Sequence, residues 1–172
     1  MNIIAIDFAT LKSGYAVFID NKLKDYGIMR SDSSNVHERI SQIRSQILQK
    51  IVQNNIAQIV LEEVPMQKNN NLMVAHDLCV GQGMVLGLCC EKELGLKLYA
   101  PSSWRSIMGL YDGTREGTKR DYQKQAAVDL VNQFYGLDFK YYKNDTKKNK
   151  TDDDMAEAIL LGLAFLKENE NG

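Results

Sequence analysis

The chain has 172 residues, 44% of them hydrophobic and 25% charged, which suits a globular protein with one sizeable core. Its formal net charge of −1 excludes a polycation, so a nucleic-acid site would need basic residues concentrated locally. The sequence has no apolar run of ~20 residues, no secretory signal pattern and no CxxC pair among its three cysteines, so we expect a cytoplasmic location without a membrane partner.

The N-terminal residues predict a three-stranded antiparallel meander. An apolar strand over 2–9 is followed by a turn in which Gly14 can supply a positive φ. A second strand over 15–19 leads through the tight Asp20-Asn21 turn into a more polar strand over 22–29, which suits a sheet edge.

The middle of the chain predicts a helix, a buried strand and a second helix. Isoleucines and a valine recur every three to four residues after the N-cap candidates of 31–35, at Val36, Ile40, Ile43, Ile47 and Ile51. The strand over 56–62 follows this crossover helix, so we expect it to be parallel and central. The helix over 72–93 is apolar on more than one face and rich in glycine, which predicts deep burial or a subunit interface with close backbone approach.

The C-terminal half predicts a fifth strand over 96–100 and a short helix from Pro101 with Trp104 directed inward. Two longer helices follow, over 119–134 and 152–166. On the first of these the apolar spacing assigns the inner face to Tyr122, Ala126, Leu130 and Phe134. We therefore expect one α/β domain over 1–172, in which three antiparallel and two parallel strands form a mixed sheet flanked by helices.

Carboxylates stand at the ends of otherwise apolar elements. Asp7 lies in the first strand, Glu62 ends the fourth, and an aspartate run with Glu157 opens the last helix. Asp154 and Glu157 are three residues apart, so they share a helix face, and that face continues into the apolar stripe facing the sheet. Taken alone, Asp7 also fits the edge of a strand, and Glu62 with Glu63 fits a solvated pair. The aspartate run alone fits an N-cap. Together they predict a cluster that two Mg²⁺ ions would neutralise.

These residues resemble the RuvC Holliday junction resolvases of the RNase H-like superfamily. The resemblance includes Asp7, the stretch from Glu62 to Asn69, Val80-Gly81-Gln82-Gly83, Tyr99-Ala100-Pro101 with Arg105, Lys119, and Asp154-Met155-Ala156-Glu157-Ala158. It implies an RNase H-like fold and a homodimeric endonuclease that resolves four-way DNA junctions by paired nicks.

The resemblance also implies residue roles. Asp7 would bridge two Mg²⁺ ions, which Mn²⁺ can replace, and Glu62, Asp154 and Glu157 would complete the site, with Asp153 as the alternative to Asp154. Residues implied to contact DNA are Arg105, Lys119, Arg120, Lys68 and Met66. The helix over 72–93 would form the dimer interface.

The chain departs from the family pattern at two positions. Pro65 stands where the family has a phenylalanine associated with opening the crossover, and Met66 is the nearest apolar substitute. Glu157 replaces the usual last aspartate and reaches one methylene further.

Basic residues flank the acids on both sides. Arg115, Lys119, Arg120 and Lys124 lie near one helix, and five lysines lie between 140 and 150. Any single one of them fits solvated surface, but together they predict a rim that contacts phosphates.

Two other functions fit parts of the sequence. A junction-binding protein with weak or no catalysis would keep the basic rim. An actin-like or sugar-kinase-related domain would share the opening hairpin, but that class needs two such domains.

Overall fold

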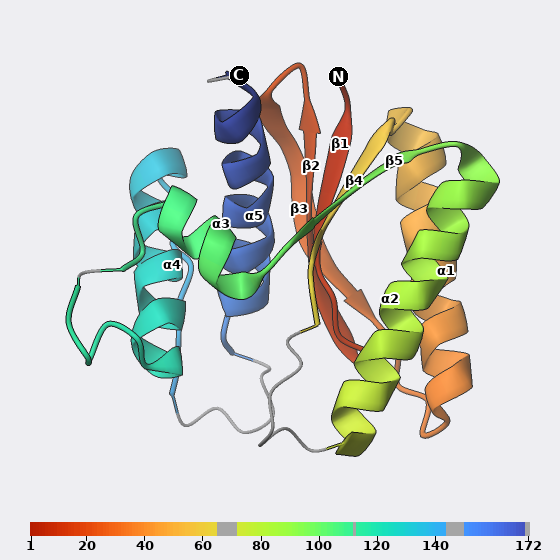
Figure 1. The fold of residues 1–172 in the computed structure, drawn as a ribbon, viewed down its shortest axis with the longest axis horizontal. Helices are drawn as coiled ribbons and strands as arrows, with labels where there is room; N and C mark the ends of the chain where they lie inside the picture. The colour runs from red at the N-terminus through yellow and green to blue at the C-terminus, as the bar shows by residue number, and fades with distance from the viewer. Residues whose placement is uncertain (65–71, 112, 144–149, 171–172) are drawn as a thin grey trace.

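A five-stranded mixed sheet forms the centre of the molecule (Figure 1). The computed structural model describes residues 1–64, 72–111, 113–143 and 150–170. The strands lie in the order β3-β2-β1-β4-β5. Their bounds are β1 Ile3–Asp7, β2 Lys12–Ile19, β3 Lys22–Arg30, β4 Gln58–Glu62 and β5 Gly95–Tyr99. The first three strands are antiparallel, and β4 runs parallel to β1 and β5, which confirms the predicted sheet.

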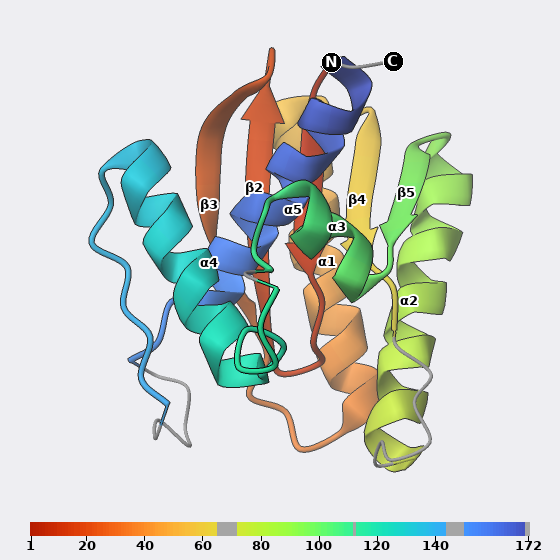
Figure 2. The same ribbon diagram turned by 60° about the vertical axis from the view of Figure 1, so that its left-hand side comes forward.

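Five helices cover the two faces of the sheet. Helices α1 (Val36–Asn54) and α2 (Leu72–Lys92) lie on one face (Figure 1). Helices α3 (Pro101–Ile107), α4 (Arg120–Tyr135) and α5 (Asp153–Glu170) lie on the other, with α5 against the sheet and α4 outside it (Figure 2). Each face buries its own apolar cluster, so the sheet is a central layer with a core on both sides.

Local sequence explains several element boundaries. The Asn35 side chain accepts hydrogen bonds from the backbone N–H groups of His37 and Glu38, which caps α1. Asp20 and Asn21 have φ values of 50° and 61°, as a tight hairpin turn between β2 and β3 requires.

Gly14 does not lie in a turn with a positive φ, contrary to the expectation from sequence. It lies within β2, where it pairs with Asp7 of β1. An added Cβ would lie 1.9 Å from the backbone oxygen of Asp154 in α5. Glycine is therefore needed at this position because α5 approaches β2 too closely for any side chain.

The predicted inner face of α4 is only partly correct, because Ala126 and Leu130 pack against the core but Tyr122 and Phe134 do not. Tyr122 is 39% exposed and Phe134 is 51% exposed. The buried residues share the spacing i, i+3, i+4, i+7 and are Lys124, Ala127, Val128 and Val131. Because the first residue of this stripe is charged, apolar periodicity favoured the neighbouring face.

Helix α2 packs on the sheet along a narrow strip. Its buried residues are Gly81, Val85, Leu88 and Cys89. Among the described residues it is the one helix whose length and composition would allow it to cross a membrane, with a mean hydropathy of 1.5 over an 18-residue window. Only 22% of that window is buried, so much of this helix is not covered by the other described residues.

Candidate metal centre and nucleic-acid interface

Two neighbouring strands bring Asp7 and Glu62 to the same edge of the sheet. β1 and β4 are parallel, and Ile6 pairs with Leu61. Asp7 and Glu62 are the next residues, so they lie side by side at the C-terminal ends of the two strands. Both carboxylates line a cavity of about 1220 Å³. The cavity extends from the β1–β2 turn to α3 and α4.

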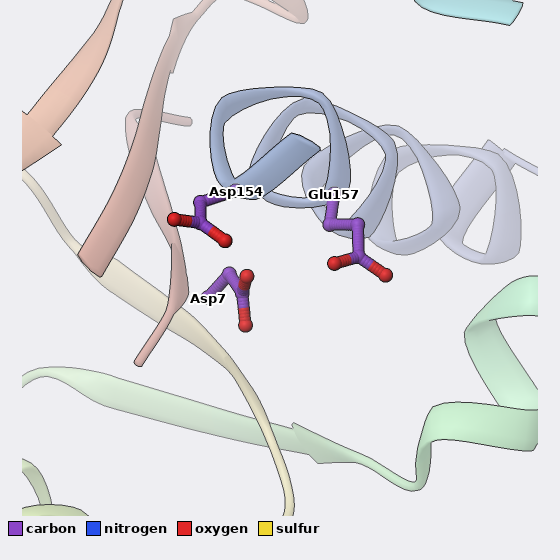
Figure 3. A group of neighbouring side chains, drawn as sticks. All are labelled: Asp7, Asp154 and Glu157. Atoms are coloured by element: carbon purple, nitrogen blue, oxygen red, sulfur yellow. The ribbon is translucent and has the colours of Figure 1, made fainter. Parts of the chain in front are cut away.

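The N-terminal part of α5 supplies two further carboxylates. Oxygen atoms of Asp7, Asp154 and Glu157 all lie within 4.8 Å of one another. Figure 3 shows Asp154 and Glu157 on the helix, with Asp7 facing them from β1. The absent side chain of Gly14 lets this helical turn lie directly against the strands.

The three consecutive aspartates have different surroundings. Asp152 accepts a hydrogen bond from the backbone N–H of Lys140, at 2.9 Å. Asp153 is 1% exposed and forms an ion pair with Lys124. Asp154 joins the cluster with Asp7. Of the three aspartates, Asp154 is thus the one whose carboxylate lies beside Asp7 and Glu157.

Three cations contact these carboxylates. Lys124 Nζ lies 3.1 Å from Glu157 Oε2, and Arg105 Nη2 lies 2.7 Å from Glu157 Oε1. Lys12 Nζ lies 3.2 Å from Asp154 Oδ2. Sequence reasoning counted Lys124 only as a rim lysine, although its place on the buried stripe of α4 could have indicated that it points inward.

Negative charge is in excess at the site. The carboxylates, when ionised, number five against the three cations and are Asp7, Glu62, Asp153, Asp154 and Glu157. Such an excess among partly buried groups requires protons or additional cations.

The pKa values show the same imbalance. Burial, followed by the charges of Glu157, Glu62 and Asp154, raises the pKa of Asp7 well above its ordinary value. Burial also raises the pKa of Glu62, although Arg105 opposes that shift. Burial acts to lower the pKa of Lys124, but the surrounding carboxylates outweigh it and raise that pKa. The lysine therefore stays charged while Asp7 tends to hold a proton in the absence of a metal.

The donor set fits a hard divalent cation. Carboxylate oxygens are the ligands that Mg²⁺ prefers, and three of them converge here. Among the described residues, no hydrogen bond reaches the buried Oδ2 of Asp154, although Lys12 Nζ lies 3.2 Å from it. A cation would satisfy this oxygen.

Glu62 has a partner that the sequence did not indicate. The indole N–H of Trp104 donates a hydrogen bond to Glu62 Oε2, at 2.6 Å. Arg105 Nη2 lies 3.6 Å from the same oxygen. An inward tryptophan was expected, but its polar partner lies 42 residues away in sequence and no local pattern identifies it.

The residues expected to contact DNA are distributed unevenly. Arg105 and Arg120 line the cavity. Lys119 does not line it, and instead precedes α4, is exposed and forms an ion pair with Glu116. Met66 and Lys68 lie outside the described residues, as does Pro65.

Comparisons with known proteins identify the fold. No protein-family model matches the sequence, and no curated protein sequence is significantly similar to it. The structure of Thermus thermophilus RuvC in complex with a Holliday junction substrate matches with a TM-score of 0.73 and 15% identity, over 100% of this chain and 97% of that one. The complex of Fowlpox virus resolvase with Holliday junction DNA matches with a TM-score of 0.61 and 19% identity, over 98% and 99%. Yeast mitochondrial Holliday junction resolvase Ydc2 matches with a TM-score of 0.57 and 12% identity, over 96% and 77%. The chain therefore has the RNase H-like fold of RuvC and other resolvases, as its sequence predicted.

Proposed function

We propose that the protein is a metal-dependent endonuclease that resolves four-way DNA junctions by paired nicks. The observation that carries this proposal is the convergence of Asp7, Asp154 and Glu157 in a large cavity that also contains basic side chains. The same fold occurs in two proteins whose structures hold Holliday junctions, which supports junctions as the substrate class.

Four carboxylates would hold two Mg²⁺ ions, with Mn²⁺ as a substitute. Asp7 is central in the cluster and would contact both ions, while Glu62, Asp154 and Glu157 would complete their coordination. Bound metal ions of this kind activate a water molecule and stabilise the leaving oxygen in phosphodiester cleavage.

Two basic residues would handle the DNA phosphate. Lys124 and Arg105 both contact Glu157 and line the cavity, so they hold its carboxylate between them. When DNA binds, their remaining N–H groups can donate to the phosphate next to the scissile bond. Arg120 is available on the same wall for a neighbouring phosphate.

A second copy of the chain would bind along α2. The exposed residues of this helix form a stripe of apolar and small side chains that includes Val80, Gly83, Leu86 and Gly87. An added Cβ at Gly83 or Gly87 would meet nothing within 4 Å, so these glycines serve no contact within the described residues. They would allow a partner helix to approach closely. Paired nicks need two active sites, and the described residues contain one such acidic cluster.

Incubation with a synthetic four-way junction and Mg²⁺ tests the activity. The protein should convert the junction into two nicked duplexes that DNA ligase can seal. Asp7→Asn should abolish cleavage, because it removes the charge that is central to metal binding. Asp129→Asn makes the same change on the exposed side of α4 and should cleave normally. Normal cleavage by Asp7→Asn would contradict the metal site.

The same assay separates the other functions. A junction-binding protein without catalysis would retard the junction in a gel and leave its strands intact with Mg²⁺ or Mn²⁺. Cleavage of forks or flaps at the same rate as junctions would indicate a broader branched-DNA nuclease. Organisation as one domain over 1–172 and the cytoplasmic location stay predictions.

A further inference from the structure

Trp104 is the single tryptophan of the chain and one of its most buried side chains. It lies on α3, with 1% of its surface exposed, and packs in the core between the sheet, α4 and α5. A tryptophan at such a position needs a hydrogen-bond acceptor for its indole N–H. Its acceptor here is a carboxylate of the candidate metal site, Glu62.

The contacts to Glu62 are directional. The donor Trp104 Nε1 and the cation Arg105 Nη2 both approach Oε2, at 2.6 Å and 3.6 Å. Holding Oε2 in this way fixes the orientation of the carboxylate group.

The chemistry of the donor also matters. An indole N–H is neutral, so it orients the carboxylate without cancelling its charge. A lysine or arginine at 2.6 Å would neutralise Glu62 more completely than Arg105 does at 3.6 Å, and would weaken its attraction for a cation. Trp104 is itself immobile, because its ring is enclosed by the core and stacks against the Arg105 guanidinium at 4.6 Å.

We propose that Trp104 is a positioning residue for Glu62, whose carboxylate its indole N–H holds in the orientation that binds a divalent cation. This inference rests on the proposed function, since it assigns Glu62 to the metal site. Hydrogen-bond partners of metal-binding carboxylates contribute about 10–100-fold in metal affinity. Loss of the N–H should therefore weaken metal binding by about tenfold or more.

The unique tryptophan allows an isosteric test. Expression in a tryptophan auxotroph with β-(3-benzothienyl)alanine replaces the N–H by sulfur at position 104 alone and keeps the shape of the ring. The matched control carries 5-fluorotryptophan, which retains the N–H. Trp104→Phe serves as a conventional second variant, with thermal unfolding to establish that each protein is folded.

Metal binding is then measured without DNA. Electron paramagnetic resonance of free Mn²⁺ gives the affinity of each protein, and ¹⁹F NMR of the 5-fluorotryptophan protein should show its single resonance shifting as Mg²⁺ is added. The benzothienyl protein should bind Mn²⁺ about tenfold more weakly than the fluorinated control. Its cleavage rate should recover at high Mn²⁺ concentration, which a general structural defect would not allow.

The outcomes separate this inference from the proposed function. Equal Mn²⁺ affinity in the two substituted proteins would overturn the role of Trp104 and leave the nuclease proposal standing. Absence of Mn²⁺ binding in the unsubstituted protein would overturn both.

Discussion

Lys124 shows how one residue can stabilise an acidic site in the absence of metal. Lys124 is 7% exposed, and its ammonium group forms ion pairs with Asp153 and Glu157. Removing one partner from a buried ion pair leaves an uncompensated charge, which typically costs about 3–5 kcal/mol.

Lys124→Met should therefore lower the free energy of unfolding by about 3–5 kcal/mol in metal-free buffer. Urea denaturation followed by circular dichroism measures this change. Lys119→Met, at the exposed start of the same helix, should change stability by less than about 1 kcal/mol. Adding Asp153→Asn to Lys124→Met should recover part of the lost stability. Equal stability of Lys124→Met and Lys119→Met would contradict a buried ion-pair network.

Gly14 determines how closely the metal-binding helix approaches the sheet. The Cβ of an alanine would lie 1.9 Å from the Asp154 backbone oxygen, so α5 must move in Gly14→Ala. We expect a loss of about 1–3 kcal/mol in the free energy of unfolding, which is typical of overpacking. We also expect Gly14→Ala to lose more Mn²⁺ affinity and cleavage activity than a control glycine substitution away from α5. Isothermal titration with Mn²⁺ and the junction cleavage assay measure these effects.

Gly95→Ala is the matched control for this substitution. Its Cβ would overlap Gln58 Oε1 at 2.0 Å, but that atom ends a flexible side chain and can move. Gly95 also begins β5, at the other end of the strand from Glu62's partner Tyr99. Normal metal binding by Gly14→Ala, or its loss in Gly95→Ala, would be inconsistent with a specific effect on α5.

At the scale of elements, α2 holds the ends of both acid-bearing strands. Gly81 lies against Phe8, the residue after Asp7, and an added Cβ would lie 2.0 Å from the Phe8 ring. Gln82 accepts a hydrogen bond from the backbone N–H of Val64, two residues after Glu62, at 3.0 Å. The helix proposed to bind a second copy therefore contacts the supports of two metal-site carboxylates.

Most elements could be predicted from sequence because their signals are local. Apolar spacing, the N-cap candidates of 31–35 and the Asp20-Asn21 turn identified α1 and the meander. The acids were also accessible to sequence reasoning, because strand and helix ends that meet at one sheet edge must bring them together.

The errors concern contacts between distant elements. The close approach of α5 to Gly14, the inward direction of Lys124 and the Trp104–Glu62 hydrogen bond depend on how α3, α4 and α5 pack on the sheet. Periodicity assigns a face to each helix separately, and on α4 it favoured a neighbouring face because the buried stripe begins with a lysine.

The exposed stripe of α2 makes a specific prediction about oligomeric state. Gly83→Leu places a large side chain where the proposed interface requires close helix approach, at a cost of about 2 kcal/mol or roughly thirtyfold in the dimer Kd. Sedimentation velocity at micromolar concentration should then show a larger monomer fraction than in the unchanged protein. The same variant should accumulate singly nicked junctions in place of ligatable paired products.

Gln49→Leu is the control for added apolar surface. It introduces the same side chain on the exposed face of α1, away from the stripe, and should leave the association state unchanged. If Gly83→Leu and the unchanged protein sediment alike, a second copy does not bind at this face of α2.

At the scale of the whole molecule, the charge of the cavity suggests that metal ions control DNA binding. The described residues lining it include six basic side chains: Lys12, Arg30, Arg39, Arg105, Arg120 and Lys124. They also include six acidic ones: Asp7, Asp32, Glu62, Asp77, Asp154 and Glu157. Basic and acidic groups are equal in number, so without bound cations this surface has little net charge to attract phosphates.

Divalent cations should therefore strengthen junction binding, which opposes the usual screening effect of salt. Ca²⁺ is a suitable probe because it binds carboxylates but does not demand the octahedral geometry of Mg²⁺. Fluorescence anisotropy with a labelled junction, at matched ionic strength, should show tighter binding in Ca²⁺ than in EDTA. Asp154→Asn should bind the junction about fivefold or more tightly than the unchanged protein in EDTA, because one negative charge near the phosphate is gone. Asp129→Asn, on the exposed side of α4, should not show this gain. Equal affinity in Ca²⁺ and EDTA would mean that the junction phosphates bind outside this cavity.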